Sequence, residues 1–197
     1  MPLSHPVPPG VLVDALAAAA EWHAGQTRKG TAIPYVSHLL QVAGLVLEHG
    51  GDVELAAAAA LHDAVEDTAA TLEEIEHRFG ARVAAVVADC TDTFPDDLPD
   101  AKSPWVDRKR RHLEHLATVG EDSALVAACD KRHNLESLVT GIRSAGLDET
   151  AARFSSAPDQ WVWYYGEALD RIRSRIPTRL ASELATLTAE LRRLVTG

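Results

Sequence analysis

The run from Leu55 to Leu61 contains only leucine and alanine, and it constrains the fold of this chain more than any other segment. Both residue types favour helices, and the small alanine side chain lets neighbouring helices approach closely. The polar pair His62-Asp63 follows at once. Ionisable side chains are costly to bury unless they are paired or bound to a metal. The segment therefore predicts a tightly packed helix that carries polar groups into a core.

Helical periodicity extends along the whole chain, whereas alternating strand patterns between hairpin turns are nearly absent. Asp52 and Thr71 are typical residues for the N-cap of a helix. Caps, glycines and prolines predict helices over 11–24, 37–49, 52–67, 71–80, 81–90, 104–120, 122–144, 157–175 and 177–195. Residues 25–34 and 91–102 are expected to be polar loops. We expect one all-α domain over 1–197, a bundle of roughly nine or ten helices.

The composition excludes several classes of protein. The 197 residues are 46% hydrophobic and carry a formal net charge of −10. Binding to nucleic acid or to an anionic membrane requires a basic face, so neither partner is expected. Cys90 and Cys129 are expected to be reduced core residues of a cytoplasmic protein. Residues 1–10 lack the features of a signal peptide, and the leucine and alanine run is too short to span a bilayer.

Four side chains in apolar surroundings form a candidate metal site. His38 lies at the start of a predicted helix, His62 and Asp63 follow the alanine run, and Asp130 ends the apolar run 125–129. Two imidazoles and two carboxylates suit Mn²⁺, Fe²⁺, Co²⁺ or Zn²⁺ and leave coordination positions for water and substrate. The spacing alone leaves open a capped or salt-bridged His-Asp pair.

Two carboxylates lie close to this candidate site in the sequence. Glu66 comes four residues after His62, and Asp67 comes four residues after Asp63. Residues at this spacing share one face of a helix. We therefore expect these four polar groups to line one wall of a site.

The remaining polar and aromatic candidates give weaker signals. His23 is expected to be a structural group, and five further histidines are expected at the surface: His5, His49, His77, His112 and His115. Four basic residues form either a phosphate-facing edge or a solvated face: Lys102, Arg108, Lys109 and Arg111. The aromatic segment 161–165 is expected to pack in the core beside the site.

Several motifs, in order, resemble those of HD-domain metal-dependent phosphohydrolases. His38, His62-Asp63 and Asp130 are similar to the H…HD…D pattern of that family. Over about residues 12–140 the chain also resembles the hydrolase domain of RelA/SpoT-type proteins, in HAGQTRKG (23–30), PYVSH (34–38), HDAVEDT (62–68), FG (79–80) and DKRHNL (130–135). Residues 141–197 are expected to form helices packed on this part. A chain this short resembles the small stand-alone alarmone hydrolases.

The resemblance implies an activity and a metal. The implied enzyme removes the 3′-pyrophosphate from ppGpp or pppGpp and leaves GDP or GTP. The implied cofactor is one Mn²⁺ ion, held by His38, His62, Asp63 and Asp130. The resemblance further assigns Glu66 and Asp67 to the nucleophilic water.

The resemblance also implies the contacts with the substrate. Arg28 and Lys29 match a loop that packs against the purine base. Asn134 matches an asparagine near the ribose, and Ser137 lies one helical turn further on. Glu136 is a departure, because the long enzymes often have arginine there, and a carboxylate either repels a phosphate or faces solvent.

Two other readings of the same residues stay open. The first keeps the chemistry but acts on another phosphorylated nucleotide, either an adenine alarmone or a phosphomonoester. The second is a non-catalytic module that binds nucleotides. The pair Glu66 and Asp67 favours an enzyme, because binding alone needs no group that activates water. The sequence leaves the oligomeric state open.

Overall fold

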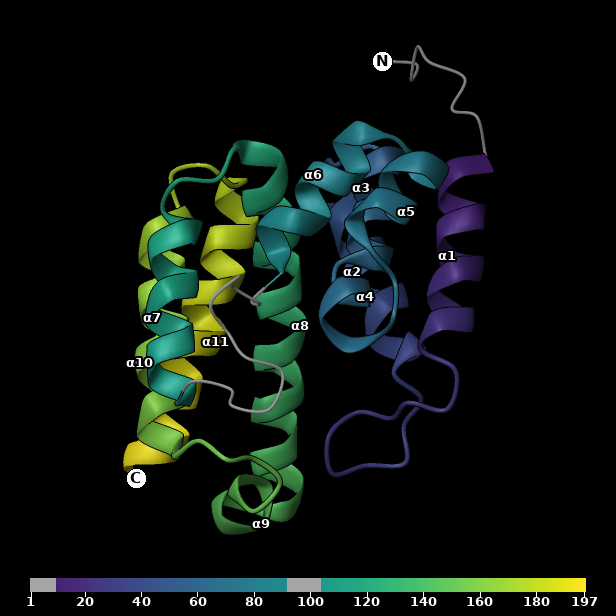
Figure 1. The fold of residues 1–197 in the computed structure, drawn as a ribbon. Helices are drawn as coiled ribbons and strands as arrows, with labels where there is room; N and C mark the ends of the chain where they lie inside the picture. Colours follow the sequence, from purple (N-terminus) through teal and green to yellow (C-terminus); the bar gives the residue numbers. More distant parts are fainter. Residues whose placement is uncertain (1–9, 92–103) are drawn as a thin grey trace.

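The computed structural model describes residues 10–91 and 104–197, and every helix or strand assigned within them is an α-helix (Figure 1). The helices are α1 (Gly10–Trp22), α2 (Val36–Glu48), α3 (Val53–Leu61), α4 (Ala64–Asp67), α5 (Leu72–Phe79), α6 (Ala81–Cys90), α7 (Trp105–Leu116), α8 (Glu121–Ala145), α9 (Leu147–Ala151), α10 (Pro158–Ile172) and α11 (Thr178–Thr196). The predicted all-α fold is confirmed. Within these ranges no helix is both long and apolar enough to cross a membrane.

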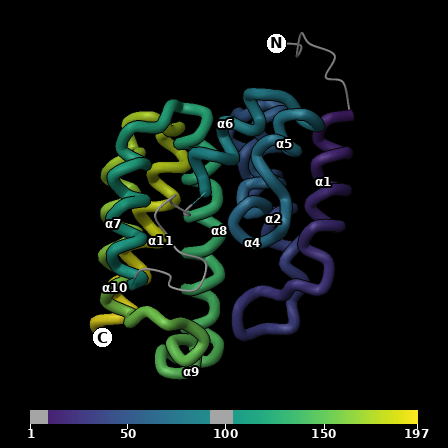
Figure 2. Tube along the Cα trace, viewed as in Figure 1, coloured from purple at the N-terminus to yellow at the C-terminus, as the bar shows by residue number. Residues whose placement is uncertain are grey.

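The long helix α8 runs between two groups of helices (Figure 1). It packs against α2, α3 and α6 on one side and against α10 and α11 on the other. Figure 2 shows the same arrangement as a tube, with the first six helices on one side of α8, with α7, α10 and α11 on the other, and with α9 at its lower end. Because α8 contacts both groups, its side chains are placed to line a site between them.

The alanine run forms the centre of the first group. Every residue from Leu55 to Leu61 in α3 is buried. The small side chains let both α1 and α2 pack against α3. The predicted N-caps are confirmed, since Asp52 accepts a hydrogen bond from the Leu55 amide at 3.0 Å and Thr71 accepts one from the Glu74 amide at 3.1 Å.

The prediction of one helix over 52–67 is wrong. Helix α3 ends at Leu61, a turn at His62 and Asp63 follows, and α4 then begins at Ala64. This stretch contains no glycine or proline, so local propensity does not explain the break. The Asp63 carboxylate instead accepts a 2.5 Å hydrogen bond from the Tyr35 hydroxyl on the chain entering α2. The turn therefore coincides with a tertiary contact, and it interrupts the predicted helical face.

Two predictions about surface histidines are also wrong. His49 is 7% exposed and His112 is 3% exposed. His112 precedes the buried Leu113 on the apolar side of α7, and its ring lies 6.3 Å from that of Tyr164. The basic residues that surround His112 in the sequence suggested an exposed helix, and they did not reveal that His112 lies on its buried face. His77 is exposed, as predicted, whereas His5 and Lys102 lie outside the described residues.

Candidate active site

Three segments bring four candidate ligand side chains together: α2, the turn at residues 62–63, and α8. Ligand atoms of His38, His62 and Asp130 lie within 4.8 Å of one another. The Oδ2 atom of Asp63 joins them, 3.0 Å from Nε2 of His62 and 3.5 Å from Nε2 of His38. The Oδ1 atom of Asp130 lies 3.3 Å from Nε2 of His38. Ligands about 2.1 Å from one ion, at angles of about 90–110°, are separated by about 3.0–3.5 Å. The group His38, His62 and Asp130 therefore fits a single divalent cation, and Asp63 lies beside its two histidines.

Each of the two histidine rings is oriented by a contact at its Nδ1 atom. Nδ1 of His62 contacts the carbonyl oxygen of Ala59 at 2.8 Å, and Nδ1 of His38 contacts Nδ1 of His133 at 2.7 Å. An N–H at Nδ1 leaves the lone pair of Nε2 available for a metal. Nε2 of His62 is buried and makes no hydrogen bond among the described residues. The chemistry of this donor set fits a divalent transition metal.

The charge balance of the site supports the same conclusion. Burial raises the pKa of the Asp63 carboxyl, but the adjacent His62 and His38 outweigh it and hold the pKa well below its usual range. Burial also raises the pKa of Asp130, where Lys131 and the same histidines hold it well below its usual range. Both carboxylates are therefore ionised at neutral pH. Two ionised, partly buried carboxylates beside two imidazoles form a donor set that suits a divalent cation.

Three neighbouring side chains position the carboxylates. The Tyr35 hydroxyl donates to Asp63, and burial together with Asp63 raises the pKa of Tyr35, so the phenol keeps its proton. The Asn134 amide donates to Oδ1 of Asp130 at 2.5 Å. The Lys131 ammonium lies 3.1 Å from Oδ2 of the same carboxylate. Each carboxylate is therefore held in a defined orientation.

Glu66 and Asp67 lie on α4, directly after the Asp63 turn, and both line the same cavity as the candidate metal ligands His62, Asp63 and Asp130. The carbonyl oxygen of Asp67 accepts a 2.8 Å hydrogen bond from the Gln26 side chain. Gln26 also contacts Nδ1 of His23 at 2.8 Å, and the His23 ring stacks on Tyr35. His23 thus has the structural role that the sequence predicted, and it fixes the backbone of the acidic pair.

The loop with Arg28 and Lys29 closes on itself before α2. Thr27 and Pro34 form an isolated antiparallel bridge, and the Arg28 amide donates to the Ile33 carbonyl at 2.8 Å. The Arg28 guanidinium reaches α8 and donates to Oδ1 of Asn134 at 2.8 Å. Arg28 and Asn134, two predicted substrate contacts far apart in the sequence, are therefore hydrogen-bonded to each other.

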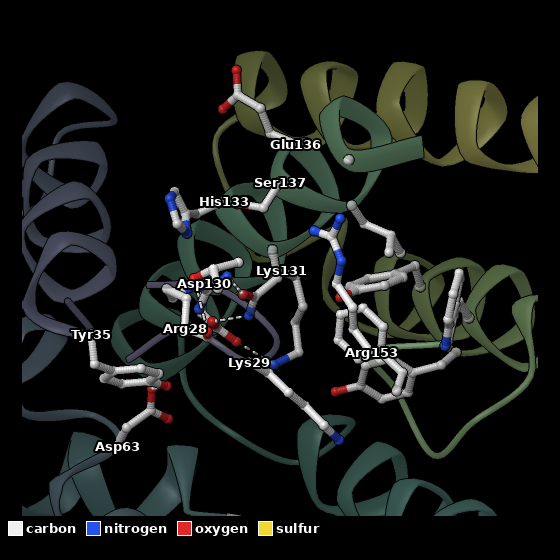
Figure 3. A pocket seen from close by; sticks show the side chains of 18 of the residues that line it. Arg28, Lys29, Tyr35, Asp63, Asp130, Lys131, His133, Glu136, Ser137 and Arg153 are labelled. Carbon is white, nitrogen blue, oxygen red and sulfur yellow. Dashed lines mark hydrogen bonds and ion pairs between the residues drawn. The ribbon is translucent and has the colours of Figure 1, made fainter. Parts of the chain in front are cut away.

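All four predicted substrate contacts line one cavity with the candidate metal ligands Asp63 and Asp130. Its volume is about 820 Å³, within the range of about 300–1,000 Å³ that is typical of small-molecule sites. Figure 3 shows Tyr35 and Asp63 on one side of this cavity and Arg153 on the other. Residues that sequence reasoning missed also line it: Tyr35, Lys131, His133, Thr150 and Arg153. Lys131 and His133 lie inside the DKRHNL motif, close to Asp130 on the same helix. This proximity was the only sequence signal that they line the site.

Two predicted features of the cavity rim are clarified. Glu136 lies at the rim, is exposed, and pairs with Arg132 at 2.9 Å, so its carboxylate has a cationic partner. Lys109 is the described member of the basic run that lines the cavity, with its ammonium 5.2 Å from the Tyr164 ring centre.

Trp161 and Tyr164 are buried and line the cavity as well, so the aromatic segment packs beside the site.

Comparisons with known proteins identify relatives along most of the chain. A family model described as an HD domain matches residues 15–153. The guanosine-3′,5′-bis(diphosphate) 3′-pyrophosphohydrolase MESH1 of Danio rerio is 41% identical over 134 residues, covering 65% of this chain and 69% of the relative. MESH1 of Homo sapiens is 38% identical over 132 residues, covering 64% and 69% of the two chains.

A solved structure agrees over nearly the full length. It is described as a metazoan orthologue of SpoT that hydrolyses ppGpp, and it superposes with a TM-score of 0.77 at 27% identity. The match covers 94% of this chain and 98% of that one, so it includes the helices beyond the family model. With the family model covering most of the chain and the relatives matched over 69% of their length, this chain belongs to the HD-domain family and, within it, to the family of the MESH1 3′-pyrophosphohydrolases.

Proposed function

We propose that this protein hydrolyses guanosine 3′,5′-bis(diphosphate) at its 3′ position, releasing pyrophosphate and leaving GDP. The observation that carries the proposal is the proximity of His38, His62, Asp63 and Asp130 to one another beside a cavity that Glu66 and Asp67 line. The MESH1 relatives are named for this reaction and match the chain along this part.

The four converging residues are proposed to hold one Mn²⁺ ion. Neutral imidazoles and carboxylates together suit this ion and its neighbours in the transition series. When bound, such an ion supplies charge neutralisation at phosphate oxygens and a lower pKa for a coordinated water. The contacts of His38 with His133, and of His62 with Ala59, engage both Nδ1 atoms, so both Nε2 atoms would be available to hold such an ion.

Glu66 and Asp67 are proposed to orient the attacking water and to accept its proton. Their helix begins one residue after Asp63, so the acidic pair lies directly beside a proposed ligand. A positioned general base contributes about 10²–10⁴-fold to a hydrolysis rate. Two neighbouring carboxylates titrate together, so the pair is treated as one unit.

Four further residues are proposed to hold the nucleotide. Arg28 and Lys29 lie on the closed loop 25–34 and contribute its base-facing side, where a planar guanidinium can stack on a purine. Asn134 is proposed to face the ribose, and Ser137 lies one turn further along α8. The Arg28–Asn134 hydrogen bond joins the base and ribose contacts into one surface.

The test is the product analysis of a single reaction. The purified protein with Mn²⁺ and guanosine 3′,5′-bis(diphosphate) is expected to release GDP and pyrophosphate in equal amounts. Release of orthophosphate alone contradicts the proposal and favours a phosphomonoesterase. The same assay with the adenine analogue measures the base preference.

Variants of the acidic pair separate catalysis from binding. Glu66→Gln and Asp67→Asn are each expected to lower kcat by about 10²–10⁴-fold while metal content stays unchanged. Glu73→Gln, at an exposed position in the first turn of α5, is the matched control and keeps full activity. Nucleotide binding without turnover in the wild type identifies a non-catalytic module instead.

A further inference from the structure

Arg153 lies on the side of the cavity opposite Asp63, and the proposed function leaves Arg153 and Thr150 without a role (Figure 3). Thr150 lies in α9 and Arg153 follows three residues later, and both line the cavity. Thr150 is 2% exposed, and its hydroxyl makes no hydrogen bond among the described residues. A buried hydroxyl without a partner is costly, and a polar group that enters the cavity can supply the missing hydrogen bond.

Arg153 packs directly against the loop that carries Lys29. A Cβ atom placed on Gly30 would lie only 2.7 Å from Cγ of Arg153, so the arginine stem lies flat against the glycine backbone. The Lys29 ammonium lies 5.6 Å from the ring centre of Phe154. The loop 25–34 and the segment after α9 therefore meet at one rim of the cavity and place two cations there.

These two cations make fewer close polar contacts than Arg28 and Lys131. Arg28 is hydrogen-bonded to Asn134, and Lys131 is paired with Asp130. The guanidinium of Arg153 has one carboxylate neighbour among the described residues, Glu149, at 3.6 Å and 70% exposed. Within the described ranges no ion pair is found for Lys29. Both groups are therefore ready to exchange solvent for an anion.

The proposed substrate carries an anionic group, its 5′-diphosphate, that could bind beside Arg153 and Lys29. With its 3′-diphosphate at the metal end, a guanosine 3′,5′-bis(diphosphate) directs its second diphosphate away from that end. An acidic protein must supply local positive charge to accept it. A guanidinium forms paired hydrogen bonds with phosphate oxygens, and a hydroxyl adds a neutral one.

We propose that Arg153, supported by Lys29 and Thr150, binds the 5′-diphosphate of the substrate and determines the preference for 5′-phosphorylated nucleotides. The proposal rests on the proposed function for the orientation of the nucleotide. It assigns Arg153 to binding and not to the chemical step. Its removal therefore changes KM and leaves kcat unchanged.

The experiment compares ligands with and without the 5′-diphosphate. Arg153→Gln is expected to raise KM for guanosine 3′,5′-bis(diphosphate) by about tenfold at constant kcat, and to leave guanosine 3′-diphosphate unaffected. The same variant is expected to bind GDP about tenfold more weakly and guanosine equally well. Arg153→Lys restores part of the affinity, and Thr150→Val weakens GDP binding by about two- to threefold. Arg173→Gln, an exposed arginine outside the cavity that pairs with Asp170, is the matched control and changes nothing.

The outcomes distinguish this proposal from the proposed function. GDP binding is measured with Mn²⁺ and again with a chelator, and the loss in Arg153→Gln must appear in both, because capture at the metal end disappears without the ion. Equal losses for GDP and guanosine, or none, overturn the 5′-diphosphate site even if the protein releases pyrophosphate normally. The proposed function alone is overturned by a different pair of results. In that case the wild type binds GDP more tightly than guanosine but does not hydrolyse the bis(diphosphate), and Arg153→Gln removes the preference for GDP.

Discussion

Nδ1 of His38 lies 2.7 Å from Nδ1 of His133, and both rings are buried. Burial, followed by the charge of His38, lowers the pKa of His133 to about 4. His133 is therefore neutral at physiological pH and accepts the N–H of His38. This contact, made from the next turn of α8 after Asp130, fixes the tautomer in which His38 offers Nε2 to a metal.

His133→Ala is expected to lower the affinity for Mn²⁺ by about 10–100-fold, because His38 loses the partner that orients it. Calorimetric titration of metal into the purified protein measures the effect. His115→Ala removes a histidine from α7 that pairs with Asp89 and serves as the control. Unchanged affinity in His133→Ala would show that the contact does not position the ligand.

Asp63→Ala is expected to weaken metal binding by more than about 100-fold and to abolish hydrolysis, because it removes a proposed ligand rather than a supporting group. The remaining buried groups then lose a charge partner, so thermal stability also falls. Elemental analysis and a melting curve measure the two effects. Asp170→Ala, an exposed carboxylate, is the control, and full metal occupancy in Asp63→Ala contradicts the ligand assignment.

Gly30→Ala is expected to destabilise the protein more than Gly25→Ala. Both glycines have positive φ, at 70° and 80°, so each substitution costs about 1–2 kcal/mol of backbone strain. A Cβ on Gly30 also meets the stem of Arg153, whereas nothing lies within 4 Å of a Cβ on Gly25. Denaturant unfolding of the two variants isolates the contact, and equal losses would show that Arg153 moves aside freely.

Stability is expected to fall below neutral pH because of His112. Burial, followed by the charges of Lys131 and Lys109, lowers the pKa of His112 to about 2. The unfolded state, with a pKa of about 6.5, binds a proton that the folded state excludes, so stability is complete above that pH and is lost as the pH falls toward 2. His112 alone removes about 2 kcal/mol between pH 7 and pH 5. Unfolding of His112→Gln over this range should show a correspondingly smaller loss, and parallel curves would contradict the assignment.

The sequence by itself determined the helical class and much of the candidate site. Alanine-rich periodicity, the caps at Asp52 and Thr71 and the lack of strand patterns act over short distances, so they are readable from the chain. The polar residues His62, Asp63 and Asp130 were conspicuous because each interrupts an apolar run where an unpaired charge is costly.

Only the tertiary structure decided where α3 ends, which histidines are buried and what forms the far side of the cavity. The turn at Asp63 coincides with its hydrogen bond with Tyr35, and the position of Arg153 follows from its packing on Gly30. The first contact spans 28 positions of the sequence and the second spans 123, so no local propensity encodes either of them. Local preferences specify helices, whereas long-range packing decides which side chains the helices bring together.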